Sequence, residues 1–363
     1  MKIAYVINSL EAGGAQFPIP ELFRVLEDEG ATVTLYALSR RNGLCIPELE
    51  EANTHWDCFE GHKKQHVKAA LWLFQKLKND KPNIIWTSLT QATLIGQLLG
   101  KLLGVPVVSW QHSAFLKPIN AKLLKLSKSL SSLWVTDSKT VKDITTKRLS
   151  LPESQVMVWP LFYVSETLKR AQHWSAGDVI KIASLGRLHP AKGYDLLIKA
   201  ILLLKSKGAV SPFEINIAGE GDERSILEAL AKAKGVSEIN FIGYVNDQTD
   251  FLSKHHAYIQ PSRREGLGIA AHEAMQMGLP VLCSKTGQMQ TTVSQGVSGW
   301  LCNTDDVDDL AKALSLLLKS PGQFAGMGAV AKQTVSNSFS QARFDQAGHA
   351  FVNQLKQIVQ DNP

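Results

Sequence analysis

The sequence predicts an α/β protein with two doubly wound parallel sheets, each in its own domain. The chain has 363 residues, a length typical of two ordinary domains. In each half, short runs of β-branched and aromatic residues alternate with amphipathic helical segments, an order typical of parallel sheets with helices on both faces. This alternation is interrupted once, by the polar stretch "SETLKRAQHWSAGD" at 165–178, and then starts again.

The first domain is predicted over residues 1–168. Its strand candidates are "KIAYVI", "ATVTLYAL", "NIIWTS", "VPVVSW", "LWVTD" and "VMVW". The second domain is predicted over 175–340, with strand candidates "VIKIASLG", "FEINIAG", "INFIG", "AYIQPS" and "PVLCS". Residues 341–363 have helical spacing and no following strand, and we expect this helix to pack back towards the first domain. Because ligands of open α/β sheets bind beyond the carboxyl ends of the strands, residues directly after each strand are the site candidates.

Composition narrows the class of protein. With 44% hydrophobic and 20% charged residues, the chain is expected to be globular. We expect a cytoplasmic protein, because the first residues do not read as a signal peptide and no apolar run is long enough to span a membrane. The four cysteines lack metal-ligand spacing, which predicts packed thiols and no metal site. The whole positive excess of +6 lies in residues 1–170, without a nucleic-acid motif, so no nucleic-acid partner is expected.

The stretch "SRREGLGIAAHEAMQMGLP" (262–280) follows the predicted strand "AYIQPS". Glu265 would therefore lie in a loop at the end of a strand, and Gly266 and Gly268 permit a tight turn there. A helix is predicted from about Ile269, and its first N–H groups can bind an anion. Glu273, about one turn later, can accept hydrogen bonds from a vicinal diol. The two glutamates can equally be a helix-dipole carboxylate and a solvated helix residue.

Two cations follow the first strand of the second domain, in "SLGRLHPAKG" (184–193). Arg187 and Lys192 at this place fit a diphosphate clamp, although each alone is also an ordinary surface charge. In the first domain, Gly13 and Gly14 follow the first strand, where they form either a phosphate-binding or a plain loop. His112 follows the predicted strand "VPVVSW", where a histidine is either structural or directed at the site.

Taken together, these motifs resemble the retaining GT-B glycosyltransferases, family four (glycosyl transferases group 1). The resemblance is carried by "GRLHPAKG", "IAGEGDERSILEALA", "INFIGYV", "IQPSRREGLGIAAHEAMQMGLPVLCS" and "GVSGWL", with "GGAQ" near the start. It implies the GT-B fold, in which two Rossmann-like domains face a central cleft. It also implies sugar transfer from a nucleoside diphosphate sugar, with retention of configuration and with neither a metal nor a cofactor; UDP is expected ahead of GDP.

The resemblance also implies a role for each candidate residue. Glu273 would bind the ribose hydroxyls and Glu265 the hydroxyls of the donor sugar. The pyrophosphate would be held by the backbone and by two cations, namely Gly266, Leu267, Gly268, Ile269, Arg187 and Lys192. Gly13 and Gly14 would lie beneath the donor phosphate, and His112 near the reacting sugar. The residues expected to act in catalysis are His112, Arg187, Lys192 and Glu265.

The same resemblance places the acceptor on the basic first domain. In "NAKLLKLSKSLSSLW", one helix face is predicted to carry lysines and another leucines, namely Lys122, Lys125 and Lys128 against Leu123, Leu126, Leu130 and Leu133. This segment is either a surface for anionic membrane headgroups or a solvated face above core leucines.

The expected function is sugar transfer to a glycan or lipid-linked acceptor in the biosynthesis of lipopolysaccharide, O-antigen or capsule, at the inner face of the cytoplasmic membrane. One alternative is a nucleotide-sugar epimerase or soluble sugar synthase on the same fold. Gln288 and Thr291 stand where the family usually has a glycine and a glutamate, which leaves the identity of the donor sugar open. A second alternative is a catalytically silent scaffold. Thr291 favours it, whereas the intact Arg187, Lys192, Glu265 and Glu273 argue against it.

Overall fold

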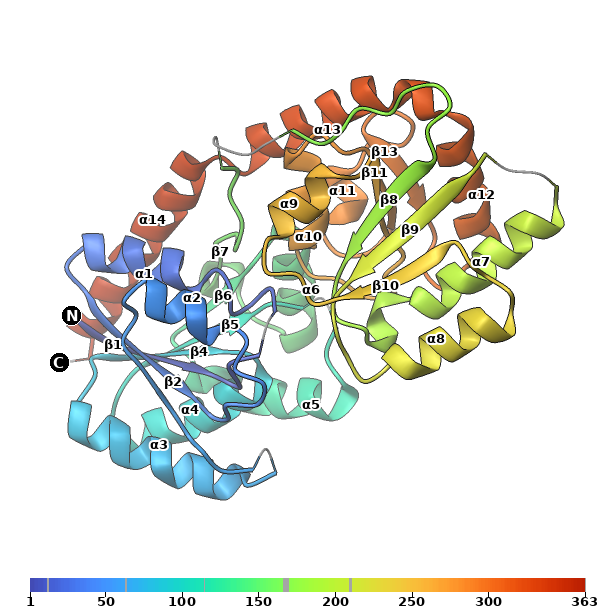
Figure 1. Ribbon diagram of the computed structural model, residues 1–363. Coiled ribbons are helices and arrows are strands. Elements are labelled where there is room, and N and C mark those ends of the chain that lie inside the picture. The colour runs from blue at the N-terminus through green and yellow to red at the C-terminus, as the bar shows by residue number, and fades with distance from the viewer. Residues whose placement is uncertain (12, 63, 114, 166–169, 209–210, 363) are drawn as a thin grey trace. The chain divides into compact units, whose positions relative to one another are not determined.

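The computed structural model describes residues 1–11, 13–62, 64–113, 115–165, 170–208 and 211–362. Its contacts divide the chain into two compact units. Unit 1 comprises Met1–Leu161 with Ala342–Pro363, and unit 2 comprises Phe162–Gln341. Each unit contains a parallel sheet with helices on both faces, which confirms the predicted fold class (Figure 1).

Within the described residues, the sheet of unit 1 has seven strands in the order β3-β2-β1-β4-β5-β6-β7. The strands are β1 (Lys2–Ile7), β2 (Thr32–Ala37), β3 (Trp56–Cys58), β4 (Ile84–Ser88), β5 (Val107–Gln111), β6 (Leu133–Thr136) and β7 (Val156–Val158). The helices are α1 (Ile19–Asp28), α2 (Ile46–Glu51), α3 (His66–Asp80), α4 (Thr90–Leu103), α5 (Pro118–Ser127), α6 (Lys139–Leu149) and α14 (Gln341–Gln360), with short 3-10 turns η1 (Lys128–Leu130) and η2 (Glu153–Gln155). The strand order reverses between β1 and β4, and this reversal is the topological switch point of unit 1.

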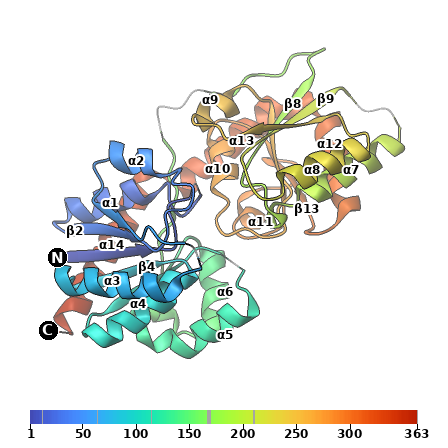
Figure 2. The ribbon, with the colours of Figure 1, turned by 60° about the horizontal axis from the view of Figure 1, so that its bottom comes forward.

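Alternate residues of β1 face opposite sides of this sheet. Ala4 and Val6 pack with the buried residues of α3 and α4. Tyr5 faces the other side, where its ring centroid lies 5.5 Å from that of Phe23 in α1. Figure 2 shows α1 on the opposite side of the strands from α3 and α4. The last helix of the chain, α14, completes the core on this second side, because Phe351 is fully buried with its ring centroid 4.7 Å from that of Trp86.

The sheet of unit 2 has six strands, counted over its described residues, in the order β10-β9-β8-β11-β12-β13. The strands are β8 (Ile180–Leu185), β9 (Phe213–Ala218), β10 (Ile239–Gly243), β11 (Ala257–Gln260), β12 (Val281–Ser284) and β13 (Gly299–Cys302). The helices are α7 (Tyr194–Ser206), α8 (Arg224–Ala233), α9 (Gln248–Ser253), α10 (Ile269–Gln276), α11 (Met289–Thr292), α12 (Val307–Lys319) and α13 (Phe324–Ser338), with 3-10 turns η3 (Pro190–Lys192) and η4 (Pro321–Gln323). The switch point of unit 2 lies between β8 and β11.

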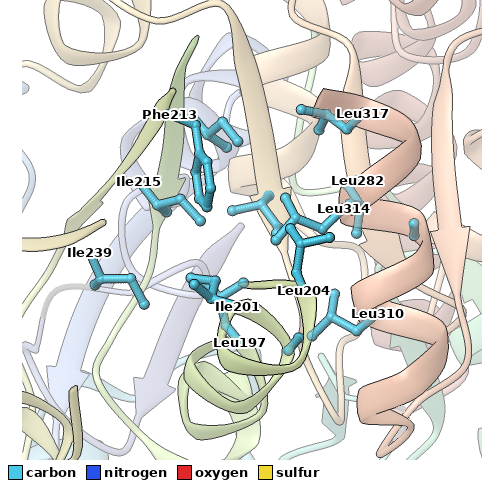
Figure 3. Close-up of a cluster of buried hydrophobic side chains, with 14 of the residues drawn as sticks. Leu197, Ile201, Leu204, Phe213, Ile215, Ile239, Leu282, Leu310, Leu314 and Leu317 are labelled. Carbon is cyan, nitrogen blue, oxygen red and sulfur yellow. The ribbon is translucent and has the colours of Figure 1, made fainter. Parts of the chain in front are cut away.

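One face of this sheet is covered by α7 and α12. Leu197, Ile201 and Leu204 of α7 project towards Leu310 and Leu314 of α12 beneath the strands (Figure 3). The opposite face is covered by α9, α10 and α13, which bury side chains such as Ala271 and Val335 against the other residues of β8, β11 and β12. The strands are apolar on both faces, as expected for a buried parallel sheet.

The division between the units comes earlier than the sequence predicted. We expected it near residues 168–175, within the polar stretch, whereas it lies between Leu161 and Phe162. The reason is that Phe162 packs in the core of unit 2, with its ring 5.7 Å from that of Phe339. The N–H of Ala171 then donates to the carbonyl of Met277 at 3.0 Å, so the described part of the polar stretch runs along unit 2.

Of the two alternatives for the basic segment of unit 1, the one that places its leucines in the core is contradicted by the structure. α5 ends at Ser127, and Leu133 belongs to β6, so the leucine pattern crosses from a helix into a strand. Leu124 is the buried residue of α5. Leu123 and Leu126 are 41% and 74% exposed. No helix in the described ranges has the length and apolar character needed to cross a bilayer.

Candidate active site

The candidate residues of unit 2 gather at the carboxyl ends of the two strands that flank its switch point. Arg187 and Lys192 lie in the loop between β8 and α7, and Glu265 lies in the loop between β11 and α10. β8 and β11 are neighbouring parallel strands, so these loops leave the same edge of the sheet side by side. This is the position at which open α/β sheets bind their ligands.

Lys192 and Glu265 form a direct ion pair. Nζ of Lys192 donates to Oε1 of Glu265 at 2.6 Å, and the two side chains are 24% and 11% exposed. The hydroxyl of Ser262 donates to the same oxygen at 2.7 Å. The resemblance assigned Lys192 to the pyrophosphate and Glu265 to the sugar hydroxyls. The structure brings the two side chains together, and each fixes the position of the other.

Arg187 is exposed in the same loop, and the described contacts give its side chain no ion pair. The methylene chain of Lys192 passes over the neighbouring Gly186, where a Cβ would lie 3.2 Å from Cε of Lys192. The two predicted cations thus share a loop but differ in their contacts. Lys192 is paired with Glu265, and Arg187 has no ion pair within the described part of the chain.

The turn before α10 is held by the next loop of the sheet. The carbonyl of Gly266 accepts a hydrogen bond from the N–H of Gln288 at 2.9 Å, and a Cβ on Gly287 would lie 2.2 Å from that carbonyl. Gly268 has φ +81° and caps the helix that begins at Ile269. The first N–H groups of a helix have no partner within it, so this fixed turn presents backbone donors at the same edge of the sheet as Lys192. Gln288 makes this contact with its backbone N–H. The contact therefore does not depend on which side chain stands at this position, where the family usually has a glycine.

Glu273 lines a pocket of about 130 Å³ in unit 2. The other lining residues are Ser165, Gln248, Thr249, Leu252, Gln276 and Met277. Among the described residues, no side chain pairs with its carboxylate, and burial raises the pKa of Glu273 to about 7. A desolvated carboxylate without a protein partner is costly unless a ligand supplies hydrogen bonds.

In unit 1, the loop after β1 carries the two predicted glycines. The carbonyl of Gly13 accepts hydrogen bonds from the N–H groups of Gln16 and Phe17, at 3.0 and 3.2 Å. Gly14 lies in the same turn, which leads into α1. The residue before Gly13 lies outside the described ranges.

His112 follows β5 and has both ring nitrogens bonded within unit 1. Nδ1 lies 2.9 Å from Oδ1 of Asp137, and Nε2 lies 2.7 Å from Oγ of Ser88. The indole N–H of Trp110 also donates to Oδ1 of Asp137, at 2.5 Å. Because Asp137 accepts, neutral His112 carries its proton on Nδ1, and Nε2 accepts from Ser88. Ser88 is fully buried, so this arrangement is not a hydrolytic triad, and it leaves neither ring nitrogen free for a substrate.

Several of these residues were missed from the sequence. Asp137 ends the run "LWVTD" and Ser88 ends "NIIWTS", so the signal that identified His112, a polar residue at a strand end, was present for both. Gln248 and Thr249 gave no such signal, because they begin a helix that follows β10 after a short loop. In the part of the chain that the structure describes, no three His, Cys, Asp or Glu residues are grouped as metal ligands would be.

Two family models match this chain. The family model described as "Glycosyltransferase Family 4" matches residues 12–163, and that described as "Glycosyl transferases group 1" matches residues 165–334. The D-inositol 3-phosphate glycosyltransferase of Kribbella flavida is 25% identical over 88% of this chain and 86% of its own length. An uncharacterized glycosyltransferase of Haemophilus influenzae is 27% identical over 62% of this chain and 64% of its own length.

A shorter match, 32% identical, covers 43% of this chain and 43% of the GDP-mannose-dependent α-(1-6)-phosphatidylinositol monomannoside mannosyltransferase of Mycolicibacterium smegmatis. Among solved structures, Anabaena HepE in complex with UDP and glucose has a TM-score of 0.82 at 18% identity, covering 98% of this chain and all of that one. The apo form of the lipopolysaccharide outer core galactosyltransferase WaaB has a TM-score of 0.73 at 15% identity, covering 98% of this chain and 99% of that chain. With family models matched in both halves and the two-sheet fold shared throughout, this chain belongs to the group 1 glycosyltransferases of the GT-B fold.

Proposed function

We propose that this chain transfers a sugar from a nucleoside diphosphate sugar to a glycan or lipid-linked acceptor, with retention of configuration and without an obligatory metal. The observation that carries the proposal is the pair formed by Lys192 and Glu265, 2.6 Å apart at the switch point of unit 2. We assign the leaving diphosphate to the cation of this pair and the sugar hydroxyls to its carboxylate. The start of α10 adds backbone donors at the same place.

The pocket around Glu273 supplies the second part of the proposal. Its carboxylate has no described protein partner and lines a space with Gln248, Thr249 and Gln276. A ribose diol would provide two hydroxyl donors to such a group, as it does for acidic residues of other nucleotide-binding sheets. We assign the diphosphate to the turn between the two glutamates, and UDP is preferred to GDP because the structural neighbour HepE is described with UDP and with UDP-glucose.

In the proposed reaction, the bond between C1 of the sugar and the distal phosphate oxygen breaks while the acceptor oxygen bonds to C1 on the same face. The acceptor proton passes to the leaving phosphate oxygen. Negative charge therefore grows on the diphosphate, where Lys192, Arg187 and the N–H groups before α10 stabilise it. Both ring nitrogens of His112 are bonded within unit 1, so we assign no proton-transfer step to this residue.

The pathway we propose is the biosynthesis of a cell-surface polysaccharide such as lipopolysaccharide, O-antigen or capsule. Two relatives support it by what they make: the amylovoran biosynthesis glycosyltransferase AmsK of Erwinia amylovora, 28% identical over 50% of this chain, and the lipopolysaccharide core biosynthesis glycosyltransferase LpsE of Rhizobium meliloti, 26% identical over 47%. A small soluble acceptor is the alternative, and the inositol phosphate relative favours it.

A lipid-linked acceptor is consistent with one surface of unit 1, which we propose contacts anionic headgroups on the cytoplasmic side of a membrane. The neighbouring helices α3, α4 and α5 expose apolar side chains, namely Val67, Leu71, Leu98, Leu102, Ile119, Leu123 and Leu126. Exposed lysines stand among them, namely Lys68, Lys101, Lys122 and Lys125. The apolar side chains can insert into a bilayer, and each lysine adds an electrostatic binding free energy of about 1 kcal/mol at an anionic surface.

Co-sedimentation tests this membrane surface. Vesicles containing phosphatidylglycerol should bind the protein at low salt, and the paired change Lys122→Glu and Lys125→Glu should abolish the binding. The same change at Lys232 and Lys234, exposed lysines of unit 2, is the matched control and should leave it intact. Binding that ignores lipid charge would contradict the proposal.

The experiment that tests the proposed activity is a screen of nucleotide sugars for slow hydrolysis without acceptor. A transferase releases the nucleoside diphosphate and the free sugar from its own donor. Proton NMR identifies the anomer released first, and retention predicts the same anomeric configuration as in the donor. Conversion of the sugar within an intact nucleotide sugar would identify an epimerase instead. Absence of turnover with every donor, despite nucleotide binding, would identify a silent scaffold.

A further inference from the structure

Arg263, two residues before Glu265, binds three loops together with one side chain. Its Nη1 and Nη2 donate to the two carboxylate oxygens of Asp195 at 2.6 and 2.8 Å. Nη1 also donates to the carbonyl of Pro190 at 2.8 Å, and Nε donates to Oδ1 of Asp305 at 2.5 Å. All three guanidinium nitrogens are thus used within unit 2, and the side chain is only 22% exposed.

These contacts converge on the segment that carries Lys192. The backbone N–H of Arg263 donates to the carbonyl of Ala191 at 2.8 Å, so Arg263 holds the two residues directly before Lys192. On the other side of Lys192, Gly193 is pressed against the end of β11, because a Cβ there would lie 2.1 Å from the carbonyl of Pro261. The position of Lys192 is therefore determined by the loop that also carries Glu265.

We propose that Arg263 is a positioning residue, which through Asp195 holds the β8–α7 loop so that Lys192 meets the diphosphate of the donor. We assign Arg263 no contact with the donor, because each of its three guanidinium nitrogens already donates to the protein. The bidentate geometry requires a guanidinium, since an ammonium group cannot engage both oxygens of Asp195 and two further acceptors in a fixed plane. This inference rests on the proposed function, because it takes the diphosphate as the ligand of Lys192.

A comparison of nucleoside and nucleoside diphosphate affinities separates positioning from general stability. Calorimetry would use UDP with uridine, and GDP with guanosine, on the wild type, Arg263→Met and Arg263→Lys. We expect Arg263→Met to lose at least about tenfold in affinity for the diphosphate and to keep its affinity for the nucleoside within about twofold. Arg263→Lys should recover only part of the loss.

Asp195→Asn provides a second route to the same result, and it stays interpretable if Arg263→Met fails to fold. Asp195→Asn should also lower the affinity for the diphosphate. In the double variant with Arg263→Lys, the fold-loss in diphosphate affinity should be smaller than the product of the two single fold-losses. The matched control is Arg224→Met, which removes an arginine of unit 2 that is also bonded to two carboxylates and a carbonyl but lies on α8. It should bind both ligands like the wild type.

Two results would contradict this inference alone. One is unchanged diphosphate affinity in folded Arg263→Met or Asp195→Asn. The other is an equal loss for nucleoside and diphosphate, which would show that Arg263 only stabilises unit 2. A wild-type protein that binds neither UDP nor GDP would overturn the proposed function itself, and this inference with it.

Discussion

Lys192 and Glu265 form a 2.6 Å ion pair that joins the two loops at the switch point of unit 2. The pair holds a cation and a carboxylate at fixed positions before any donor binds, and the hydroxyl of Ser262 bonds the same carboxylate oxygen. Groups that are already in place need little reorganisation when charge develops on a leaving diphosphate. The first prediction follows from this pair.

Replacing Lys192 with methionine should lower turnover by about 100- to 1000-fold, as the loss of one preorganised donor does in other enzymes. Because acceptor binding does not use this residue, the KM for the acceptor should change little. Steady-state kinetics with the donor identified by the hydrolysis screen measures both quantities. Lys205→Met is the matched control, since Lys205 also forms an ion pair of unit 2, 2.8 Å from Glu238, but at the far end of α7. Turnover near the wild-type value in Lys192→Met would remove the leaving-group role.

The hydrogen bonds of His112 predict its tautomer. At a pH where the ring is neutral, nitrogen-15 NMR should show the proton on Nδ1, because Asp137 accepts from that atom at 2.9 Å. Asp137→Asn should shift these resonances and lower stability, since a buried partner is lost. Asp143→Asn, at an exposed position of α6, should leave the spectrum unchanged. A neutral ring with its proton on Nε2 in the wild type would contradict the assignment.

The sequence predicted the strands of both sheets apart from β3 and β13, because apolar runs bounded by glycine and polar residues are local signals. It also located Glu265 and Lys192, whereas their contact depends on the pairing of β8 with β11, strands separated by more than seventy residues. The alternative that placed Leu123 and Leu126 in the core failed because residues of a helix and of a strand shared one periodic leucine pattern. The bonds of Arg263 could not be predicted, since they join three loops that only the folded sheet brings together.

The pKa of Glu273 predicts how stability depends on pH. Burial raises this pKa from 4.5 to about 7, so between these values the folded state holds a proton that the unfolded state has released. The free energy of unfolding should therefore fall as the pH rises from about 5 to 8 by this contribution. Glu273→Gln should remove it, which makes the variant more stable than the wild type at pH 8 by up to about 3 kcal/mol, with a small difference at pH 5.

Urea unfolding at the two pH values measures this contribution. Glu51→Gln, at an exposed glutamate of α2 with no ion pair among the described contacts, is the control variant. An advantage of Glu273→Gln that is the same at pH 5 and pH 8 would show that the carboxyl group is not desolvated.

The most direct test of the central claim is calorimetric titration at pH 8 with nucleoside diphosphates that have or lack the 2′-hydroxyl. The proposed diol site predicts that the wild type binds UDP or GDP with micromolar affinity and loses at least about tenfold for the 2′-deoxy form, because Glu273 then lacks one donor. Glu273→Gln should bind both forms with similar, weaker affinity. Equal wild-type affinity for the ribose and 2′-deoxyribose forms, or wild-type affinity in Glu273→Gln, would contradict the claim that this pocket receives the ribose of a nucleotide sugar.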